Sequence, residues 1–550
     1  MKNIVLLIII FLSISSCNKD ILELKPLDRL SESSVWEDQS LIELYVNGSY
    51  HSVEHDYYGS MWCSLTDEAY NIQNGSSEMV QRGELTADNV GTVSDLGSDE
   101  SWLNPNTNNM NMFDYWKDAY SGIRNINIYF SKIDAAIIDE SIKKQMNGEM
   151  KFIRAFIYAN LIWRYGGVPI ITDIFELNGD YTVSRNSYDE CVTYICSELD
   201  DAIADLPAQQ SLDQMGRASG NAAKALKSRV LLYAASPLNN PSNDLNKWKD
   251  AADAAEALLN KGYTLNDDYQ HIFLEDNNEI IFARSFTLSN FHYTALYNGR
   301  NGSHGWGSNC PVQNLVDDYE MAATGKLPSD PSSGYDPNNP YVGRDPRFYA
   351  SILYDGAVWA GRETETFDGG LDSRKSNIEA WNATLTGYYL KKFIQEDVPP
   401  VYGSTFNATN PYVFFRYGEI LLNYAEAKFE LGDEQTARTY VNMIRSRNGV
   451  DMPPITDAGD ALRQRIYHER RIELAFEGQR FFDVRRWKIA SITANKPLIA
   501  MQIFKQNDGS KTYEPINLMN TGFQNKDYLL PIPFAEINRS KGGLIQNPGY

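Results

Sequence analysis

Basic and aromatic residues are concentrated in the stretch HERRIELAFEGQRFFDVRRWK, which runs from His468 to Lys488. It holds five arginines, four carboxylates and four aromatic side chains. Arginines between aromatic rings can grip nucleic acid or stack on a flat ligand, and they can also form structural ion pairs. The net charge of −22 argues against nucleic acid, because phosphate binding depends on a surplus of Lys and Arg.

The spacing of the charges favours the structural interpretation. Residues three or four apart on a helix lie on the same side of it. Three pairs of opposite charge have this spacing: Arg465 with Glu469, Arg470 with Glu473, and Glu477 with Arg480. Ile472 and Phe476 are also four apart and can form an apolar face. We therefore expect this stretch to be internal scaffold, with charges paired along one helix.

The tryptophans indicate where a ligand could bind. Four fall in helical patterns and are expected in the core: Trp116, Trp163, Trp248 and Trp487. Five others lie in irregular stretches beside Asn, Gly, Asp and Ser: Trp62, Trp102, Trp306, Trp359 and Trp381. A flat ring can cover the C–H face of a sugar while polar neighbours bond its hydroxyls. A ring packed under a loop is the alternative for each of them, yet we expect at least one ligand platform.

No catalytic signature stands out. The sequence has no Walker phosphate loop, no nucleophile elbow and no paired-histidine zinc helix. His468 is a lone helical histidine, which is more often structural than a general base. A glycosidase carboxylate pair stays open, since such pairs are defined by their separation in space. The acidic stretch DPSSGYDPNN lacks EF-hand spacing, so turn formation is favoured over calcium binding, and no cofactor or metal is predicted.

The N-terminus has the features of a secretory signal. Lys2 precedes an apolar run that is too short to span a bilayer of about 30 Å. LSISSC resembles a bacterial lipobox, which implies cleavage before Cys17 and acylation of its sulfur and new amino group. The other cysteines (Cys63, Cys191, Cys196 and Cys310) have no metal-binding spacing and are expected to be buried thiols.

Helical periodicity dominates the rest of the chain. Residues 148–165 form one predicted helix, which Gly166 and Gly167 end. Residues 221–236 and 248–261 predict an antiparallel helix pair, and 416–449 predict a second pair spaced much like a tetratricopeptide unit. Strand signals are few and short: EIIFARSF, YYLKKFI and YLLPIP. Long irregular stretches at 92–112, 298–311 and 327–347 carry aromatics and are expected to be ordered surface.

Several segments, taken in order, resemble one family. They are the lipobox, YWKDAYSGIRNIN, FIRAFIYANLIWRYGGVPI, GRASGNAAKALKSRVLLYAASP, RYGEILLNYAEAKFELG, HERRIELAFEGQRFFDVRRWK and the closing LLPIPFAEINRS…QNPGY. Together they resemble the SusD/RagB outer-membrane lipoproteins of Bacteroidetes nutrient-uptake systems. The resemblance implies a mainly α fold: tetratricopeptide-like helix pairs in a right-handed helical scaffold, with long irregular loops and a few short strands.

The resemblance also implies an organisation. It gives a signal peptide at 1–16, a lipid-anchored tether at 17–30 and a single SusD-like domain at 31–550. Within that domain it implies an N-terminal part at about 31–265 and a C-terminal part at about 266–550.

The function that the resemblance implies is non-catalytic glycan capture at the cell surface. The protein would be lipid-anchored in the outer membrane, facing outward, and would deliver oligosaccharides to a SusC-like TonB-dependent transporter. Alternatives are a peptide-binding uptake lipoprotein of the same fold and a glycoside hydrolase.

Ligand residues are expected in the early loops and in the middle of the chain. The early candidates, matched loosely to the family pattern, are Asp67, Arg82, Trp102 and Asn104. The middle candidates, chosen on composition and loop position, are Tyr297, Trp306, Trp359 and Trp381.

Overall fold

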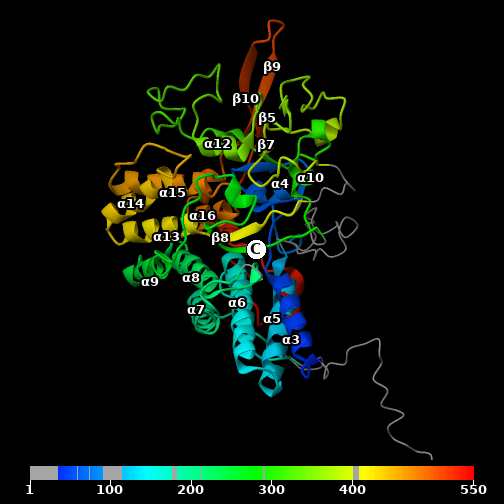
Figure 1. Cartoon of the computed structure of the whole chain (residues 1–550), viewed down its shortest axis with the longest axis vertical. Coiled ribbons are helices and arrows are strands. Elements are labelled where there is room, and N and C mark those ends of the chain that lie inside the picture. The colour runs from blue at the N-terminus through cyan, green and yellow to red at the C-terminus, as the bar shows by residue number, and fades with distance from the viewer. Residues whose placement is uncertain are drawn as a thin grey trace, which may run out of the picture.

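The computed structural model describes residues 35–57, 60–73, 75–90, 114–175, 182–211, 214–288, 291–400 and 408–550. Helices form its lower and left parts, whereas loops and short strands form its upper part (Figure 1). Helices supply far more of the described chain than strands do, which confirms the mainly α prediction. No helix in these ranges has the length and apolar content needed to cross a membrane.

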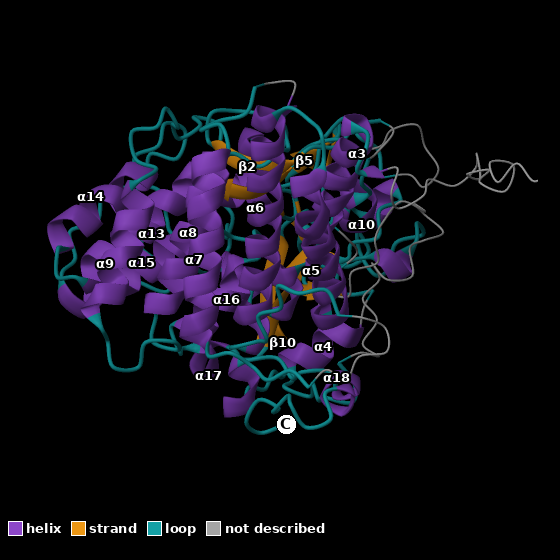
Figure 2. Cartoon of the chain, turned by 90° about the horizontal axis from the view of Figure 1, so that it is seen from below, coloured by secondary structure: helices purple, strands orange, loops and turns teal. Residues whose placement is uncertain are grey.

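Stacked helix pairs build the scaffold, as Figure 2 shows from below. The stack comprises α6 (Glu140–Tyr165), α7 (Tyr188–Asp205), α8 (Gly220–Ala235), α9 (Leu245–Glu256), α13 (Tyr417–Glu430), α14 (Glu434–Arg445) and α15 (Gly459–Glu473). Each helix packs against the next, and α13 packs on α9, which brings pairs far apart in the sequence together. The following helix α16 (Gln479–Arg486) packs on the 3-10 turn at Trp62–Leu65. This arrangement is the tetratricopeptide-like scaffold that the sequence predicts.

Local sequence signals set the ends of the central helix α6. The Asp139 carboxylate accepts hydrogen bonds from the backbone N–H groups of Ser141 and Ile142, which caps the first turn. Gly166 ends the helix with φ of +76°, a conformation that glycine adopts without strain. The second half of α6 is buried on nearly all sides, because α5 (Tyr115–Lys132), α7 and α3 (Gln39–Ser49) pack around it.

Short strands hold the upper loops together in two-stranded antiparallel sheets. Within the described ranges the pairs are β1 (Ala69–Asn71) with β3 (Asn309–Pro311), β2 (Ile280–Arg284) with β8 (Tyr412–Arg416), β4 (Ile352–Leu353) with β7 (Tyr389–Leu390), β5 (Val358–Trp359) with β6 (Arg362–Glu363), and β9 (Leu498–Lys505) with β10 (Lys511–Met519). The β9–β10 hairpin projects from the top of the molecule in Figure 1.

Two predicted strands are observed and one is wrong. EIIFARSF contains β2 and YYLKKFI contains β7, whereas YLLPIP forms no strand. Its first residue ends the 3-10 turn Asn525–Tyr528, and the rest is irregular chain. Its backbone N–H groups bond to partners outside any strand. The Leu530 N–H donates to the Arg164 carbonyl, and the Ile532 N–H donates to the Gln546 side chain. The stretch DPSSGYDPNN forms the predicted turns, since Asp330 and Asp336 each accept a bond from a backbone N–H two residues on.

The stretch from His468 to Lys488 is internal, as predicted. Glu473 has no exposed surface, and its carboxylate contacts the guanidinium groups of Arg347, Arg416 and Arg447 at 2.6–2.9 Å. Burial alone would raise the pKa of Glu473, but these three arginines hold it well below its ordinary value. We call these four residues the Glu473 cluster.

The predicted pairing within that stretch is wrong. Arg470 pairs with Asp483, Glu477 pairs with Arg416 and Lys392, and Arg465 pairs with Glu320 and Asp457. The predicted pairs presuppose a solvated helix face, where neighbours three or four residues apart are the available partners. Here the helices are enclosed, so the charges of the predicted pairs meet carboxylates and cations of other elements. Asp483 and Arg486 do pair within α16, at 2.8 Å.

Candidate functional site

The β1–β3 pairing brings an early loop against a middle loop. Asn71 lies opposite Asn309, and the Ile72 N–H extends the ladder by bonding to the Ser308 carbonyl at 3.1 Å. Gln73, just after β1, is thereby placed beside the loop that precedes β3. A pairing that spans more than two hundred residues thus defines one end of the site.

The loop before β3 folds back on α10 (Thr294–Asn298). The Trp306 N–H donates to the Leu296 carbonyl at 2.8 Å, and the Ser308 N–H donates to the Tyr297 carbonyl at 2.7 Å. This turn requires glycine, because a Cβ on Gly305 would lie 2.2 Å from the carbonyl carbon of Gly299. The fold-back brings the rings of Trp306 and Tyr297 to 5.6 Å between centroids. Tyr297 is only 2% exposed, so its ring supports the half-buried Trp306 from within the fold.

Gln73 ties this loop to a third segment. Its Nε2 donates to the Trp306 carbonyl at 2.9 Å and to the Asn382 side-chain oxygen at 2.8 Å. Gly307 makes a close approach there as well, since a Cβ on it would lie 2.5 Å from the Asn382 carbonyl. Residues from three distant parts of the chain therefore meet at the amide of Gln73.

The third segment presents Trp381 to solvent. Trp381 is 70% exposed, although its carbonyl is fixed by a 2.9 Å bond from Arg374. In the same turn, one Glu379 oxygen lies 3.2 Å from His304 Nδ1 and the other accepts a bond from the Asn382 amide. An exposed ring thus stands on an ordered turn with amide, carboxylate and imidazole groups beside it.

The chemistry of this loop site suits a neutral polyhydroxyl ligand. The site consists of Gln73, Tyr297, His304, Trp306, Glu379, Trp381 and Asn382. A large ring that stays exposed loses water contacts when a sugar face covers it, while polar neighbours on the same frame can bond hydroxyl groups. The parts are held by hydrogen bonds before any ligand arrives, which lowers the ordering cost of binding.

Trp359 lies beneath the loop site. It is 9% exposed and packs with Ala295 of α10 and Tyr389 of β7 in a small apolar cluster. Its carbonyl accepts a 2.9 Å bond from Arg300, which belongs to the loop that carries Trp306. Trp62, the other described tryptophan of the irregular stretches, is also buried and packs against Phe481 and Phe482.

Asp67 is placed against the charged interior. Its carboxylate pairs with Arg471 at 2.8 Å and with Arg480 at 2.9 Å. Burial alone would raise the pKa of Asp67, but these two guanidinium groups lower it well below its ordinary value. Asp67 precedes β1 and so connects the arginine-rich helices to the strand that positions Gln73.

Arg82 lies at the end of α4 (Gly75–Gln81) and is partly exposed. It pairs with Glu78 at 2.7 Å, and Glu78 accepts a hydrogen bond from the hydroxyl of Tyr70 in β1. Arg82 is thereby linked through Glu78 to Tyr70 of β1, the strand that precedes Gln73. Trp102, Asn104 and the lipidation residue Cys17 lie outside the described residues, so their assignments stay predictions.

Sequence reasoning missed Gln73, His304, Glu379 and Asn382. Each is an ordinary loop residue by type, and only the β1–β3 pairing and the glycine contacts bring them together. One sequence feature could have identified two of them, since His304 and Asn382 are close in the sequence to tryptophans that were predicted to bind ligand. In the described ranges, no group of three or more His, Cys, Asp or Glu side chains is arranged to hold a metal ion.

Comparison with known proteins places this geometry in a family. Residues 270–550 match the model of the SusD family, and residues 23–232 match a SusD-like model described as starch-binding and associating with the outer membrane. SusD-like protein P2 of Formosa agariphila is 25% identical over 574 aligned positions, which cover 99% of this chain and 98% of that protein.

Solved structures agree with the family models. A SusD-like protein from Bacteroides fragilis NCTC 9343 is 31% identical, with a TM-score of 0.79 and coverage of 96% of this chain and 100% of that one. A SusD-like carbohydrate-binding protein from the same organism is 24% identical, with a TM-score of 0.76 and coverage of 92% and 99%. The chain belongs to the SusD family of carbohydrate-binding, outer-membrane-associated proteins.

Proposed function

We propose that this protein captures oligosaccharides at the outer surface of the cell through the loop site. The observation that carries the proposal is the placement of Trp306 and the exposed Trp381 on two loops that Gln73 joins, with the buried Tyr297 packed against Trp306. A sugar chain laid on the two tryptophan rings would meet amide, carboxylate and imidazole groups at its hydroxyls. Trp102 and Asn104, the other candidates from the sequence, are proposed as further ligand residues.

The proposal includes anchoring and delivery. Acylated Cys17 would hold the protein in the outer membrane with its glycan site facing outward, because more than one acyl chain makes an anchor durable. A SusC-like TonB-dependent transporter would receive the captured oligosaccharide. Support comes from the lipobox, from the family and from the family model that names association with the outer membrane. We propose no catalytic step.

The first experiment should identify the glycan. Solved structures with this fold include a laminarin-binding SusD-like protein and surface glycan-binding protein A from Bacteroides fluxus. Those ligands belong to those proteins, so a broad glycan array that includes laminarin and starch is the suitable probe. Binding of one glycan class by the full-length chain is the expected result.

Variants then connect the array to the site. Replacing Trp306 and Trp381 together by Ala should weaken glycan binding at least about tenfold. Leu245→Ala, which changes an exposed apolar residue on α9, should leave the binding unchanged. Binding of peptides in place of glycans would overturn the glycan proposal in favour of peptide uptake. New reducing ends on incubation with a bound glycan would indicate a hydrolase.

A further inference from the structure

A second hollow lies on the opposite part of the molecule, along α5. Its volume is about 330 Å³, within the usual range for small-ligand pockets. One face of α5 forms its roof with Trp116, Tyr120 and Asn127, which repeat at helical spacing. In Figure 1, α5 belongs to the lower helical part, whereas α10 of the loop site lies in the upper part.

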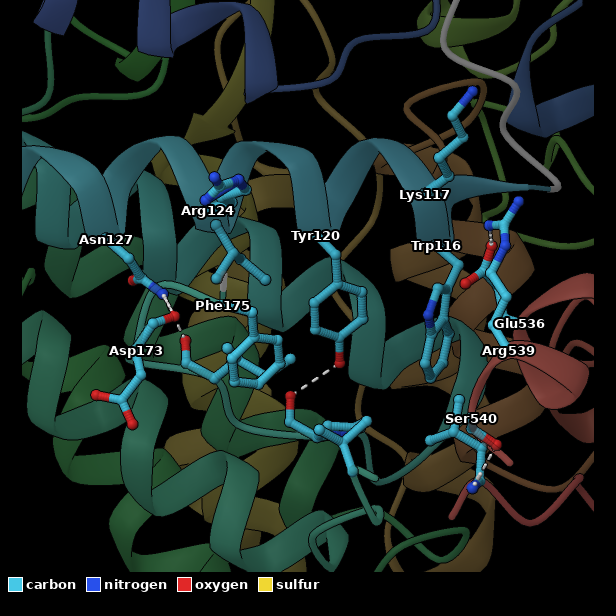
Figure 3. A pocket seen from close by; sticks show the side chains of 15 residues that line it. Trp116, Lys117, Tyr120, Arg124, Asn127, Asp173, Phe175, Glu536, Arg539 and Ser540 are labelled. Atoms are coloured by element: carbon cyan, nitrogen blue, oxygen red, sulfur yellow. Dashed lines mark hydrogen bonds and ion pairs between the residues drawn. The ribbon is translucent and has the colours of Figure 1, made fainter. Parts of the chain in front are cut away.

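Aromatic side chains line the middle of this α5 pocket. The rings of Trp116 and Tyr120 hang from α5 into the hollow, and the ring of Phe175 lies beside Tyr120 (Figure 3). The ring centroid of Trp116 lies 5.2 Å from that of Tyr120 and 5.3 Å from that of Tyr165. Trp116 is only 4% exposed, whereas Tyr120 on α5 and Phe175 in the chain after α6 are half-buried. The α5 pocket therefore offers the partly open rings of Tyr120 and Phe175, with Trp116 packed beside Tyr120.

Charged groups of both signs stand at its ends. Arg124 and Asp173 are exposed near one end, and within the described part of the chain neither side-chain charge has a hydrogen-bond or ion-pair partner. At the other end, Glu536 and Arg539 of α18 (Phe534–Arg539) pair with each other. The exposed Lys117 also lines this end (Figure 3). Each end thus carries charges of both signs, so a neutral polar molecule can find both a cation and a carboxylate there.

Backbone groups of Pro169, Ile170 and Ile171 in the pocket wall are already hydrogen-bonded. The Pro169 carbonyl accepts a bond from the Tyr120 hydroxyl at 2.8 Å, and the Ile171 carbonyl accepts one from the Asn127 amide at 3.0 Å. The N–H groups of Ile170 and Ile171 donate to Asn186 and Tyr158. Strand addition needs unpaired backbone groups, so this wall does not suit an extended peptide.

We propose that the α5 pocket is a second carbohydrate-binding site, which takes one or two neutral sugar units through the rings of Tyr120 and Phe175, with Trp116 supporting Tyr120. A sugar offers an apolar face to the rings, and its hydroxyls can donate to Asp173 and accept from Arg124. This inference rests on the proposed glycan function and adds a contact point distant from the loop site. A polymer could then be held at two places on one protein.

The test compares three variants of the full-length chain. The loop variant is Trp306→Ala with Trp381→Ala, the pocket variant is Arg124→Ala with Asp173→Ala, and Ser121→Ala on the exposed face of α5 is the control. The probes are maltose, cellobiose, laminaribiose and xylobiose, each titrated while saturation-transfer NMR signals of the sugar are recorded. Arg124 and Asp173 carry no structural contact through their charges, so the pocket variant should melt like the wild type.

The expected result is that the loop variant still binds at least one disaccharide. Adding the pocket substitutions to it should weaken that residual binding at least about tenfold, because two hydrogen-bonding groups are lost. The control Ser121→Ala should change neither the binding of the wild type nor that of the loop variant.

Other outcomes separate the two proposals. Binding by the wild type that vanishes in the loop variant overturns the second site and leaves the proposed function standing. Residual binding that the pocket substitutions do not change also overturns the second site. Binding that the loop substitutions leave intact and the pocket substitutions remove supports the second site and overturns the loop assignment. No binding of any probe to the wild type counts against both.

Discussion

Two regions of this protein combine aromatic rings with charged side chains, and they use them in opposite ways. In the Glu473 cluster each charge is buried and directly faces an opposite charge. At the loop site, Trp381 is largely exposed while its backbone is fixed. Residue type alone does not separate scaffold from binding site. The difference lies in whether the side chains have already found partners within the chain.

Removing Glu473 should cause the largest change and should affect the scaffold alone. Glu473→Ala leaves three guanidinium groups buried without their shared carboxylate, and breaking such a buried network costs about 3–5 kcal/mol of unfolding free energy. Thermal and chemical denaturation would measure this loss, with exposed Glu514→Ala as the matched control. A fully stable Glu473→Ala protein that no longer binds glycan would contradict the scaffold assignment.

Replacing Gln73 should affect the loop site with little effect on the scaffold. Gln73→Ala removes the two hydrogen bonds that join the Trp306 loop to the Asn382 turn, so we expect roughly tenfold weaker glycan binding. Unfolding free energy should fall by only about 1–2 kcal/mol. Calorimetric titration with the glycan identified on the array would measure the affinity. Unchanged affinity would mean that the ligand does not depend on this junction.

Glu68 offers a pH test of the charged interior. Burial raises its pKa from the ordinary range to about 7, despite the opposing effect of Arg471 and Arg480. Between its unfolded pKa and about 7 the folded protein holds a proton that the unfolded chain has lost, so this carboxyl lowers stability as pH rises. Glu68→Gln should therefore stabilise the protein at pH 8 relative to wild type and have little effect at pH 4.

Unfolding curves at these two pH values would show the difference. Equal effects of Glu68→Gln at both pH values would contradict the raised pKa.

Arg82→Ala should produce the smallest change. A partly exposed ion pair with Glu78 contributes about 0–1 kcal/mol, so the melting temperature should hardly move. Titration of the same variant with glycan decides whether Arg82 reaches the ligand. A clear loss of affinity would extend the loop site to α4, and no loss would confine it to the junction around Gln73.

Much of the fold follows from local sequence signals. Apolar periodicity with Gly166 at the end predicted the core of α6, and the spacing around 416–449 predicted the α13–α14 pair. The β9–β10 hairpin was missed although Asp508 and Gly509 mark its turn, because Pro515 makes the second strand look irregular. Local sequence patterns were least informative for segments whose contacts lie far away in the sequence.

The loop site shows the same limit. Composition pointed to Tyr297, Trp306 and Trp381, and the structure brings these three near one junction. Nothing in the sequence near position 73 indicates that its amide bonds to residues 306 and 382, because that depends on strand pairing across the whole fold. The intrahelical ion pairs failed for a related reason, since enclosed helices direct their charges toward other elements.

The measurement that tests the central claim most directly is a paired one on the Trp306→Ala, Trp381→Ala double variant. Its affinity for the glycan found on the array and its melting temperature should be determined side by side with wild type. We predict that affinity falls at least about tenfold, from the loss of two stacking rings, while the melting temperature stays nearly unchanged. Full affinity in the double variant, or a loss of affinity that merely accompanies unfolding, would contradict the assignment of glycan binding to the loop site.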